Sequence, residues 1–168
     1  IWEPNDPNEN SISITYKELH KRVCEFANAL KLNGAKKGDR ICLYMPMVPE
    51  LAIATLACAR IGAIHSVVFA GFSAKALADR INDADCNILL TSDGLYRGKK
   101  QLCLKDIADE ALQYCPTIKS CIVLNRTNQS VQMKKGRDFW WHEELNKVDS
   151  TCIAEEMDSE DPLFVLYT

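Results

Sequence analysis

Residues 59–73 read ARIGAIHSVVFAGFS, and this stretch decides the fold class of the chain. An apolar segment, Glu50–Arg60, comes before it, and a run rich in β-forming residues, Ile64–Phe69, lies inside it. A turn containing Gly71 then leads to Ser73, which is suited to cap a new helix. The order predicts a strand whose carboxyl end opens onto a helix N-terminus. Doubly wound α/β proteins bind their ligands at such strand ends, and the free amides of the helix favour anions.

The same alternation of helix and strand continues on both sides of this stretch. Thr15 and Glu18 form a capping box ahead of an apolar pattern at helical spacing that stops at Gly34. The further predicted segments are a strand at Ile41–Tyr44, a helix at Ala74–Ala84, a strand at Asn87–Thr91, a helix at Lys105–Tyr114 and a strand at Ser120–Leu124. Alternating helices and strands are typical of a parallel sheet with helices on both faces. We therefore predict an α/β fold with a doubly wound, mostly parallel sheet flanked by helices.

The last third of the chain is less regular. We expect a polar loop or hairpin at 125–137 and a short helix, Phe139–Lys147, capped by Asp138. An acidic stretch then leads to Asp161–Thr168, which has the pattern of a buried strand with no following segment to pair with it. We treat residues 125–160 as an irregular connector within the domain, and we expect the chain to be a piece of a larger protein.

Composition narrows the class of protein. With 168 residues, 47% of them hydrophobic, the chain is long enough for one domain with its own core. A net charge of −3 argues against a nucleic-acid-binding protein, and no apolar run approaches the roughly 18 residues that cross a membrane. The polar, proline-containing start is not a signal peptide.

The eight cysteines are scattered without a C-x-x-C pair, and most fall on apolar faces of predicted elements. Free cysteine behaves as a small buried hydrophobic residue, so we expect reduced thiols and a cytoplasmic protein, with the nucleus as a second compartment. The three histidines are isolated in the sequence, and no metal site is expected.

The first candidate binding segment is Phe69-Ala70-Gly71-Phe72-Ser73, at the carboxyl end of the strand in the opening stretch. Gly71 allows a ligand to approach the backbone closely, and an exposed phenylalanine of this segment can stack on a base. A glycine turn before a capped helix is also the ordinary way in which α/β loops are built. The residues alone therefore leave both interpretations open.

The second candidate is Tyr96-Arg97-Gly98-Lys99-Lys100, in a polar loop after the strand that ends at Thr91. Three cations in these five residues suit a phosphorylated ligand, and each charged hydrogen bond contributes about 1.5–3 kcal/mol. A solvated loop whose charges assist solubility is the alternative. Both candidate segments follow strands at the same edge of the predicted sheet, and together they favour a nucleotide-like anion.

Four separated segments carry a resemblance to a known family. They are GDRICLYMPMVPE at 38–50, LACARIGAIHSVVFAGFS at 56–73, Tyr96–Lys100 and Asp161–Thr168. In this order they closely resemble the AMP-forming acetate–CoA ligases, the acetyl-CoA synthetase family of the adenylate-forming superfamily. The likeness runs from Trp2 to Thr168, is weakest at 125–137, and is greatest to the eukaryotic cytosolic form.

The resemblance implies an activity and a set of ligand contacts. The family makes acetyl-AMP from acetate and ATP, with magnesium, and then transfers the acetyl group to coenzyme A. In the family the loop matching Arg97, Gly98, Lys99 and Lys100 contacts coenzyme A, and Arg97 and Lys100 serve its phosphates. The loop matching Phe69-Ala70-Gly71 lies against its adenine. Lys99 departs from the family pattern, because relatives often carry an acidic residue there.

The resemblance also implies that much of the enzyme lies outside this chain. In the family, a Ser/Thr/Gly-rich loop that handles the ATP phosphates follows the strand matching Asp161–Thr168. We therefore expect residues 1–168 to be part of an AMP-binding N-terminal domain, truncated at both ends, without a catalytic residue or ligase activity of its own. Its partners are then small molecules and the remainder of its own polypeptide. A propionyl- or other short-chain acyl-CoA synthetase, and a non-catalytic module that binds coenzyme A or a nucleotide, are the alternatives.

Overall fold

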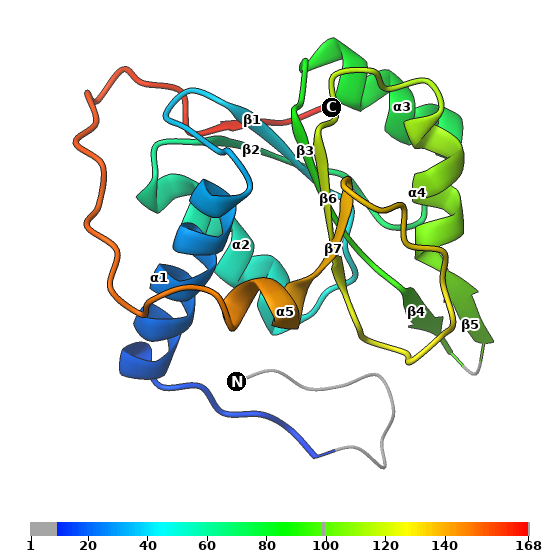
Figure 1. Cartoon of the computed structure of the whole chain (residues 1–168), viewed down its shortest axis with the longest axis horizontal. Helices are drawn as coiled ribbons and strands as arrows, with labels where there is room; N and C mark the ends of the chain where they lie inside the picture. Colours follow the sequence, from blue (N-terminus) through cyan, green and yellow to red (C-terminus); the bar gives the residue numbers. More distant parts are fainter. Residues whose placement is uncertain (1–9, 99, 168) are drawn as a thin grey trace.

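A six-stranded sheet forms the centre of the protein (Figure 1). The computed structural model describes residues 10–98 and 100–167. The elements in chain order are α1 (Tyr16–Leu32), β1 (Arg40–Leu43), α2 (Pro49–Arg60), β2 (Ile64–Val67), α3 (Ala74–Asp83), β3 (Ile88–Ser92), β4 (Gly94–Arg97), β5 (Lys100–Cys103), α4 (Leu104–Leu112), β6 (Ser120–Leu124), β7 (Asp138–Trp140), α5 (Trp141–Leu145) and β8 (Phe164–Val165). β4 and β5 form a separate two-stranded sheet.

The central sheet has the strand order β7-β6-β3-β1-β2-β8, and every neighbouring pair is parallel. β1 lies in the middle, β2 is added on one side of it, and β3 on the other. The strand order therefore reverses between β1 and β3, which is the switch point at which doubly wound sheets bind ligands. This arrangement confirms the predicted doubly wound, parallel fold.

Helices cover both faces of the sheet and create two hydrophobic cores. In Figure 1, α1, α2 and α5 lie on the left of the sheet, and α3 and α4 lie on its right. Because side chains alternate along a strand, Ile41 and Leu43 of β1 enter the core under the first group, and Cys42 and Tyr44 enter the core under the second. We call these two clusters of buried residues the α1/α2 core and the α3/α4 core.

Helices α1 and α3 begin at the caps that the sequence predicts, Thr15 and Ser73. The hydroxyl of Thr15 accepts a hydrogen bond from the Glu18 amide at 3.2 Å, and Pro49 occupies the first turn of α2. Ser73 caps α3 by accepting from the Ala76 amide. Each cap satisfies an amide that would otherwise have no partner in the first turn. None of the described helices combines the length and apolar character that crossing a bilayer requires.

All eight cysteines are free thiols, and seven of them are buried. Burial raises the pKa of the Cys58 and Cys121 thiols to about 12. These side chains therefore pack as hydrophobic residues, as the sequence predicts.

Residues 94–103 form a β-hairpin, whereas the sequence suggests a polar loop. β4 and β5 are antiparallel, and Arg97 pairs with Lys100 next to the turn. Gly98 has a φ of +61°, a left-handed conformation that glycine adopts without strain. The prediction was wrong because the short strands carry exposed polar residues and lack a clear alternating pattern.

Residues 125–160 contain regular structure as well as loops. Phe139 and Trp140 belong to β7, which pairs with β6, so the predicted helix Phe139–Lys147 is wrong at its start. α5 is only five residues long, and its N-cap is Trp140 instead of Asp138. Asp138 is buried in ion pairs with Lys105 and Arg137, contacts that a local reading of the sequence misses.

The final strand is also different from the prediction. β8 pairs with β2 in a parallel register, so it has a partner, but it is short and lies at the sheet's edge. Phe164 is 53% exposed and Leu166 is 68% exposed. An apolar run forms a buried strand only where other segments of the protein cover both faces of the sheet. The exposed side chains of Phe164 and Leu166 are not covered in this way, so the predicted burial is wrong.

Candidate functional site

The loop after β2 presents the first candidate segment. Ala70 is buried in the α3/α4 core, whereas Phe69 is 67% exposed. A Cβ atom at Gly71 would collide with the Phe69 ring, so this glycine lets the ring fold back over the loop. The segment thus combines a buried residue, Ala70, with the exposed aromatic ring of Phe69 and with backbone that carries no side chain at Gly71.

A buried tyrosine holds this loop in place. The hydroxyl of Tyr44 donates a hydrogen bond to the Phe72 carbonyl at 2.7 Å and lies 3.4 Å from the Ala70 carbonyl oxygen. Burial, with a smaller effect of neighbouring Cys42, raises the pKa of Tyr44 to about 12. The hydroxyl therefore stays protonated and remains a donor at physiological pH. Tyr44 directly follows β1, so the central strand of the sheet positions the loop.

The hairpin carries the second candidate segment. Arg97 and Lys100 are exposed and directly opposite each other across the two strands. Residues in such a pair project from the same face of a hairpin, and like charges there are destabilising. A phosphate between them would remove that repulsion. Lys99, the third cation of the segment, lies outside the described residues.

The two faces of the hairpin have different surroundings. Leu95 and Arg97 are two residues apart and share a face, and Leu95 packs against the α3/α4 core. Tyr96 belongs to the opposite face, where the guanidinium of Arg126 lies 5.4 Å from the centre of its ring. Arg97 and Lys100 therefore lie on the same face of the hairpin as Leu95, the residue that packs against the α3/α4 core.

Both candidate segments follow carboxyl ends of strands on this side of the sheet. β2 and β3 flank β1, so their ends are about two strand spacings, or roughly 10 Å, apart. Ala70 is part of the α3/α4 core, and Leu95 packs against the same core. The two predicted segments therefore start at the same edge of the sheet, the carboxyl edge, where a ligand is expected.

A residue that sequence reasoning missed connects the base of the hairpin to the rest of the protein. Asp93 is fully buried between β3 and β4. Its Oδ1 accepts hydrogen bonds from the amides of Gly94 at 2.7 Å and Arg126 at 2.8 Å. Its Oδ2 accepts from the Thr127 hydroxyl and the Gln129 amide, each at 3.0 Å. A lone aspartate after a strand gives no local sign of partners more than 30 residues away.

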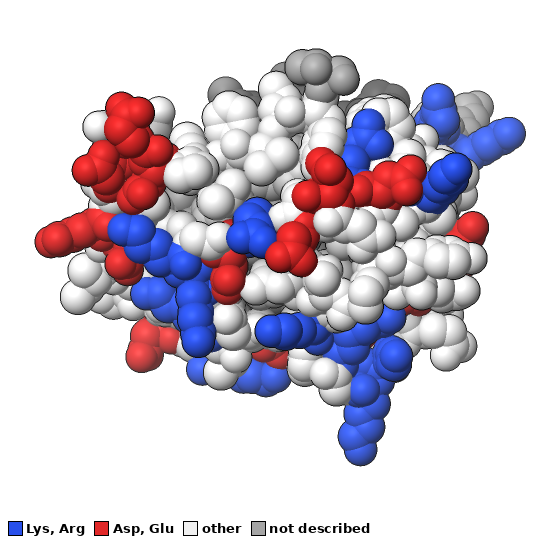
Figure 2. Space-filling view, turned by 90° about the horizontal axis from the view of Figure 1, so that it is seen from above, with Lys and Arg blue, Asp and Glu red and all other residues white. Residues whose placement is uncertain are grey.

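Charge is unevenly distributed over the molecule. Figure 2 shows a cluster of Asp and Glu side chains at the upper left with Lys and Arg side chains below it, and other Lys and Arg side chains projecting at the upper right and at the bottom. The left end is where Figure 1 places the connector before β8, and the hairpin lies on the right. The acidic residues of this connector are Glu155, Glu156, Asp158, Glu160 and Asp161. These carboxylates make the connector an unfavourable place for an anion to bind.

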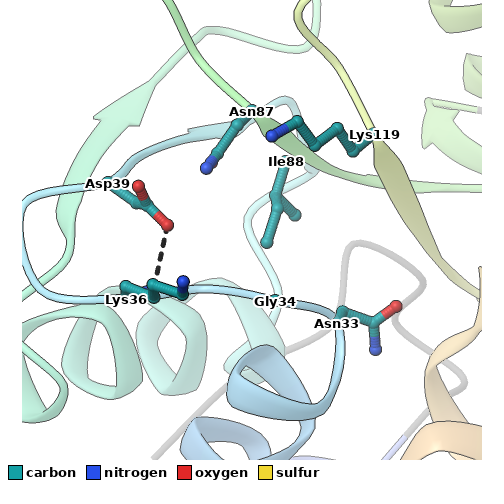
Figure 3. Close-up of a pocket in the computed structure, with 7 residues that line it drawn as sticks. All are labelled: Asn33, Gly34, Lys36, Asp39, Asn87, Ile88 and Lys119. Carbon is teal, nitrogen blue, oxygen red and sulfur yellow. Dashed lines mark hydrogen bonds between the residues drawn. The ribbon is translucent and has the colours of Figure 1, made fainter.

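A small polar pocket lies at the opposite edge of the sheet (Figure 3). It has a volume of about 160 Å³ and is lined by residues next to the amino ends of strands, among them Lys36, Asn87 and Lys119. The Lys36 amide donates to Oδ2 of Asp39 at 2.8 Å, which closes one side. The pocket contains none of the predicted site residues, and ligands of doubly wound sheets bind at the carboxyl edge.

Comparisons with known proteins agree with this architecture. The profile of a family described as "AMP-binding enzyme" matches residues 5–168. An acetyl-coenzyme A synthetase from Alkalilimnicola ehrlichii is 57% identical over the whole chain, which covers 26% of that protein. One from Nostoc linckia is 52% identical, and the chain covers 50% of it. The solved structure of acetoacetyl-CoA synthetase from Streptomyces lividans superposes on 95% of this chain with a TM-score of 0.85 and 28% identity, and 24% of that protein is covered.

Proposed function

The chain belongs to the AMP-binding enzyme family, and on this premise we propose that it is part of an acetate–CoA ligase. Such an enzyme activates acetate with ATP to acetyl-AMP and then transfers the acetyl group to coenzyme A. The proposal is supported by relatives named acetyl-coenzyme A synthetase that are 52–57% identical over the full chain. The chain spans about a quarter of the length of most of these relatives.

We assign one wall of the coenzyme A site to this chain. The observation that carries the assignment is the exposed pair of Arg97 and Lys100 on one face of the hairpin. Two opposed cations are a stable arrangement when an anion binds between them, and coenzyme A offers a 3′-phosphate and a diphosphate. Gly98 keeps the turn tight, so that both cations lie next to it.

Phe69, Ala70 and Gly71 form the second part of this wall in the proposal. The exposed ring of Phe69 offers an apolar face on which the adenine of coenzyme A can stack. Gly71 leaves the backbone open to close approach. These residues bind and orient the thiol substrate. We assign no residue of this chain to ATP, its magnesium ion or the chemical steps.

The test is to replace Arg97 or Lys100 by alanine in the full-length enzyme. Loss of one exposed charged hydrogen bond removes about 1.5 kcal/mol of binding, which corresponds to roughly a tenfold rise in the KM for coenzyme A. Acetate-dependent exchange between ATP and pyrophosphate does not involve coenzyme A, and we expect it to stay within twofold of the wild-type rate.

Lys17→Ala is the matched control, because Lys17 is an exposed cation on α1 and its loss changes the net charge equally. We expect it to leave both measurements unchanged. If exchange collapsed together with the coenzyme A reaction in Arg97→Ala, the hairpin would serve the ATP half of the reaction or the fold, and the assignment would be wrong.

A further inference from the structure

The hairpin that carries Arg97 and Lys100 depends on contacts at its base. Within residues 10–98 and 100–167, β4 and β5 pair only with each other, and an isolated two-stranded hairpin is marginally stable in water. The opposed cations at its tip add repulsion. The orientation of the tip is therefore determined by whatever holds the two strands where they leave the body of the protein.

Asp93 holds both strands of the hairpin. Its carboxylate accepts the Gly94 amide at the start of β4, and its carbonyl accepts the Leu104 amide immediately after β5, at 3.0 Å. Its own amide donates to the Leu124 carbonyl at the end of β6 at 2.9 Å. One buried residue thus fixes the point at which the chain enters the hairpin, the point at which it leaves, and the neighbouring strand.

The same carboxylate draws the loop of residues 126–129 against the hairpin. The Thr127 amide and hydroxyl both donate to it at 3.0 Å. The packing is close enough that a Cβ at Gly94 would lie 2.6 Å from the Thr127 hydroxyl oxygen and 2.7 Å from the Leu102 carbonyl oxygen. Beyond this contact, Arg126 stacks on Tyr96. The loop therefore supports the face of the hairpin opposite the cation pair.

We propose that Asp93, through Thr127 and the loop of residues 126–129, is a positioning residue for coenzyme A binding. The inference rests on the proposed function of the hairpin. Asp93 has no exposed surface and does not contact the ligand; it holds the hairpin at the angle that points Arg97 and Lys100 toward the phosphates. The loop after β6, which is remote in sequence from both candidate segments, then becomes part of the coenzyme A site.

The experiment uses three variants of the full-length enzyme. Thr127→Val removes the hydroxyl that donates to Asp93 and keeps the shape of the side chain, whereas Thr127→Ser keeps the hydroxyl and is the matched control. Asp93→Asn replaces the carboxylate, which only accepts hydrogen bonds, by a carboxamide. The NH2 group of that carboxamide is a donor and would face backbone N–H groups that are also donors. The readouts are the KM for coenzyme A, the rate of ATP–pyrophosphate exchange, and tryptic cleavage after Arg97 and Lys100.

We expect Thr127→Val to raise the KM for coenzyme A about fivefold and to speed cleavage at the hairpin by a similar factor, with exchange within twofold of wild type. We expect Asp93→Asn to exceed both effects and Thr127→Ser to remain close to wild type. Saturating coenzyme A should slow the cleavage in every variant that still binds it.

Two results would overturn the inference. One is a Thr127→Val enzyme with unchanged KM and unchanged cleavage, while Arg97→Ala still raises the KM; the hairpin would then bind coenzyme A without help from the loop. The other is an equal loss of exchange and of coenzyme A turnover in Thr127→Val, which would indicate general support of the fold. An unchanged KM in Arg97→Ala would instead refute the proposed function itself.

Discussion

The ammonium group of Lys105 lies 2.9 Å from Oδ2 of Asp138, and both side chains are completely buried. This ion pair joins α4 to β7, at the edge of the sheet. Asp109 lies 2.7 Å from Lys105 and 2.7 Å from Arg137, and Arg137 also pairs with Asp138. Two cations and two carboxylates thus form one closed network, which fixes the end of the long connection between β6 and β7.

Removing one cation from this network should lower the free energy of unfolding substantially. In Lys105→Met, the Asp138 carboxylate stays buried and loses one of its two cations, and such a change costs about 3 kcal/mol of unfolding free energy. Urea unfolding, followed by tryptophan fluorescence, measures the loss. Arg22→Met is the comparison, because Arg22 and its partner Glu18 are 39% and 42% exposed, and its loss should cost less than about 1 kcal/mol. Equal losses in the two variants would contradict this account of burial.

The network also predicts how stability depends on acid. Burial alone would raise the pKa of Asp138, but hydrogen bonds from Arg137 and Lys105 outweigh it and hold the pKa below the usual 3.8. A carboxyl whose pKa is lowered by folding contributes stability that is present above its unfolded pKa and is lost as the pH falls through its folded pKa. We therefore expect the free energy of unfolding to decline below about pH 4.

Asp138→Asn provides the measurement for this prediction. The variant should be less stable than wild type at pH 7, and the gap should narrow between pH 5 and pH 2 because its side chain no longer titrates. Asp149→Asn, at an exposed position, should follow the wild-type curve throughout. A gap between Asp138→Asn and wild type that stayed constant down to pH 2 would show that Asp138 does not carry this dependence.

The pKa of Lys105 determines the pH above which the same network no longer stabilises the fold. Burial lowers its pKa, but hydrogen bonds to Asp109 and Asp138 outweigh that effect and raise it above 10.5. A lysine with a raised pKa contributes stability below its unfolded pKa, and this contribution is lost as the pH rises through the folded value. The network is therefore fully formed between the acid and alkaline limits, a range that includes physiological pH.

The sequence predicts the central sheet well because its strands and helices carry strong local signals. β3 and β6 each contain an uninterrupted apolar run, and Ser73 and Thr15 are recognisable caps. The topology follows, since alternating helices and strands have few ways to form a parallel sheet. The two candidate segments could be located for the same reason, because both follow strands of that sheet.

The features that the sequence did not reveal depend on partners distant in the chain. Asp138 looks like a helix cap until Lys105 is placed beside it by the packing of α4. Asp93 is one polar residue after a strand, and its role depends on amides 33 to 36 residues further on. The residues on either side of Gly98 have no strong alternating pattern, so the sequence does not reveal the hairpin.

Tyr44 offers a last prediction, because it connects the centre of the sheet to the loop that carries Phe69. Tyr44→Phe removes the donor to the Phe72 carbonyl and keeps the buried ring, so we expect a loss of about 1 kcal/mol in unfolding free energy. The loop should also loosen and raise the KM for coenzyme A two- to threefold, with ATP–pyrophosphate exchange unchanged. Tyr114→Phe is the control, since that residue is 66% exposed. A Tyr44→Phe enzyme that is as stable as Tyr114→Phe and has an unchanged KM for coenzyme A would contradict this prediction. The Tyr44 hydroxyl would then hold neither the fold nor the loop that carries Phe69.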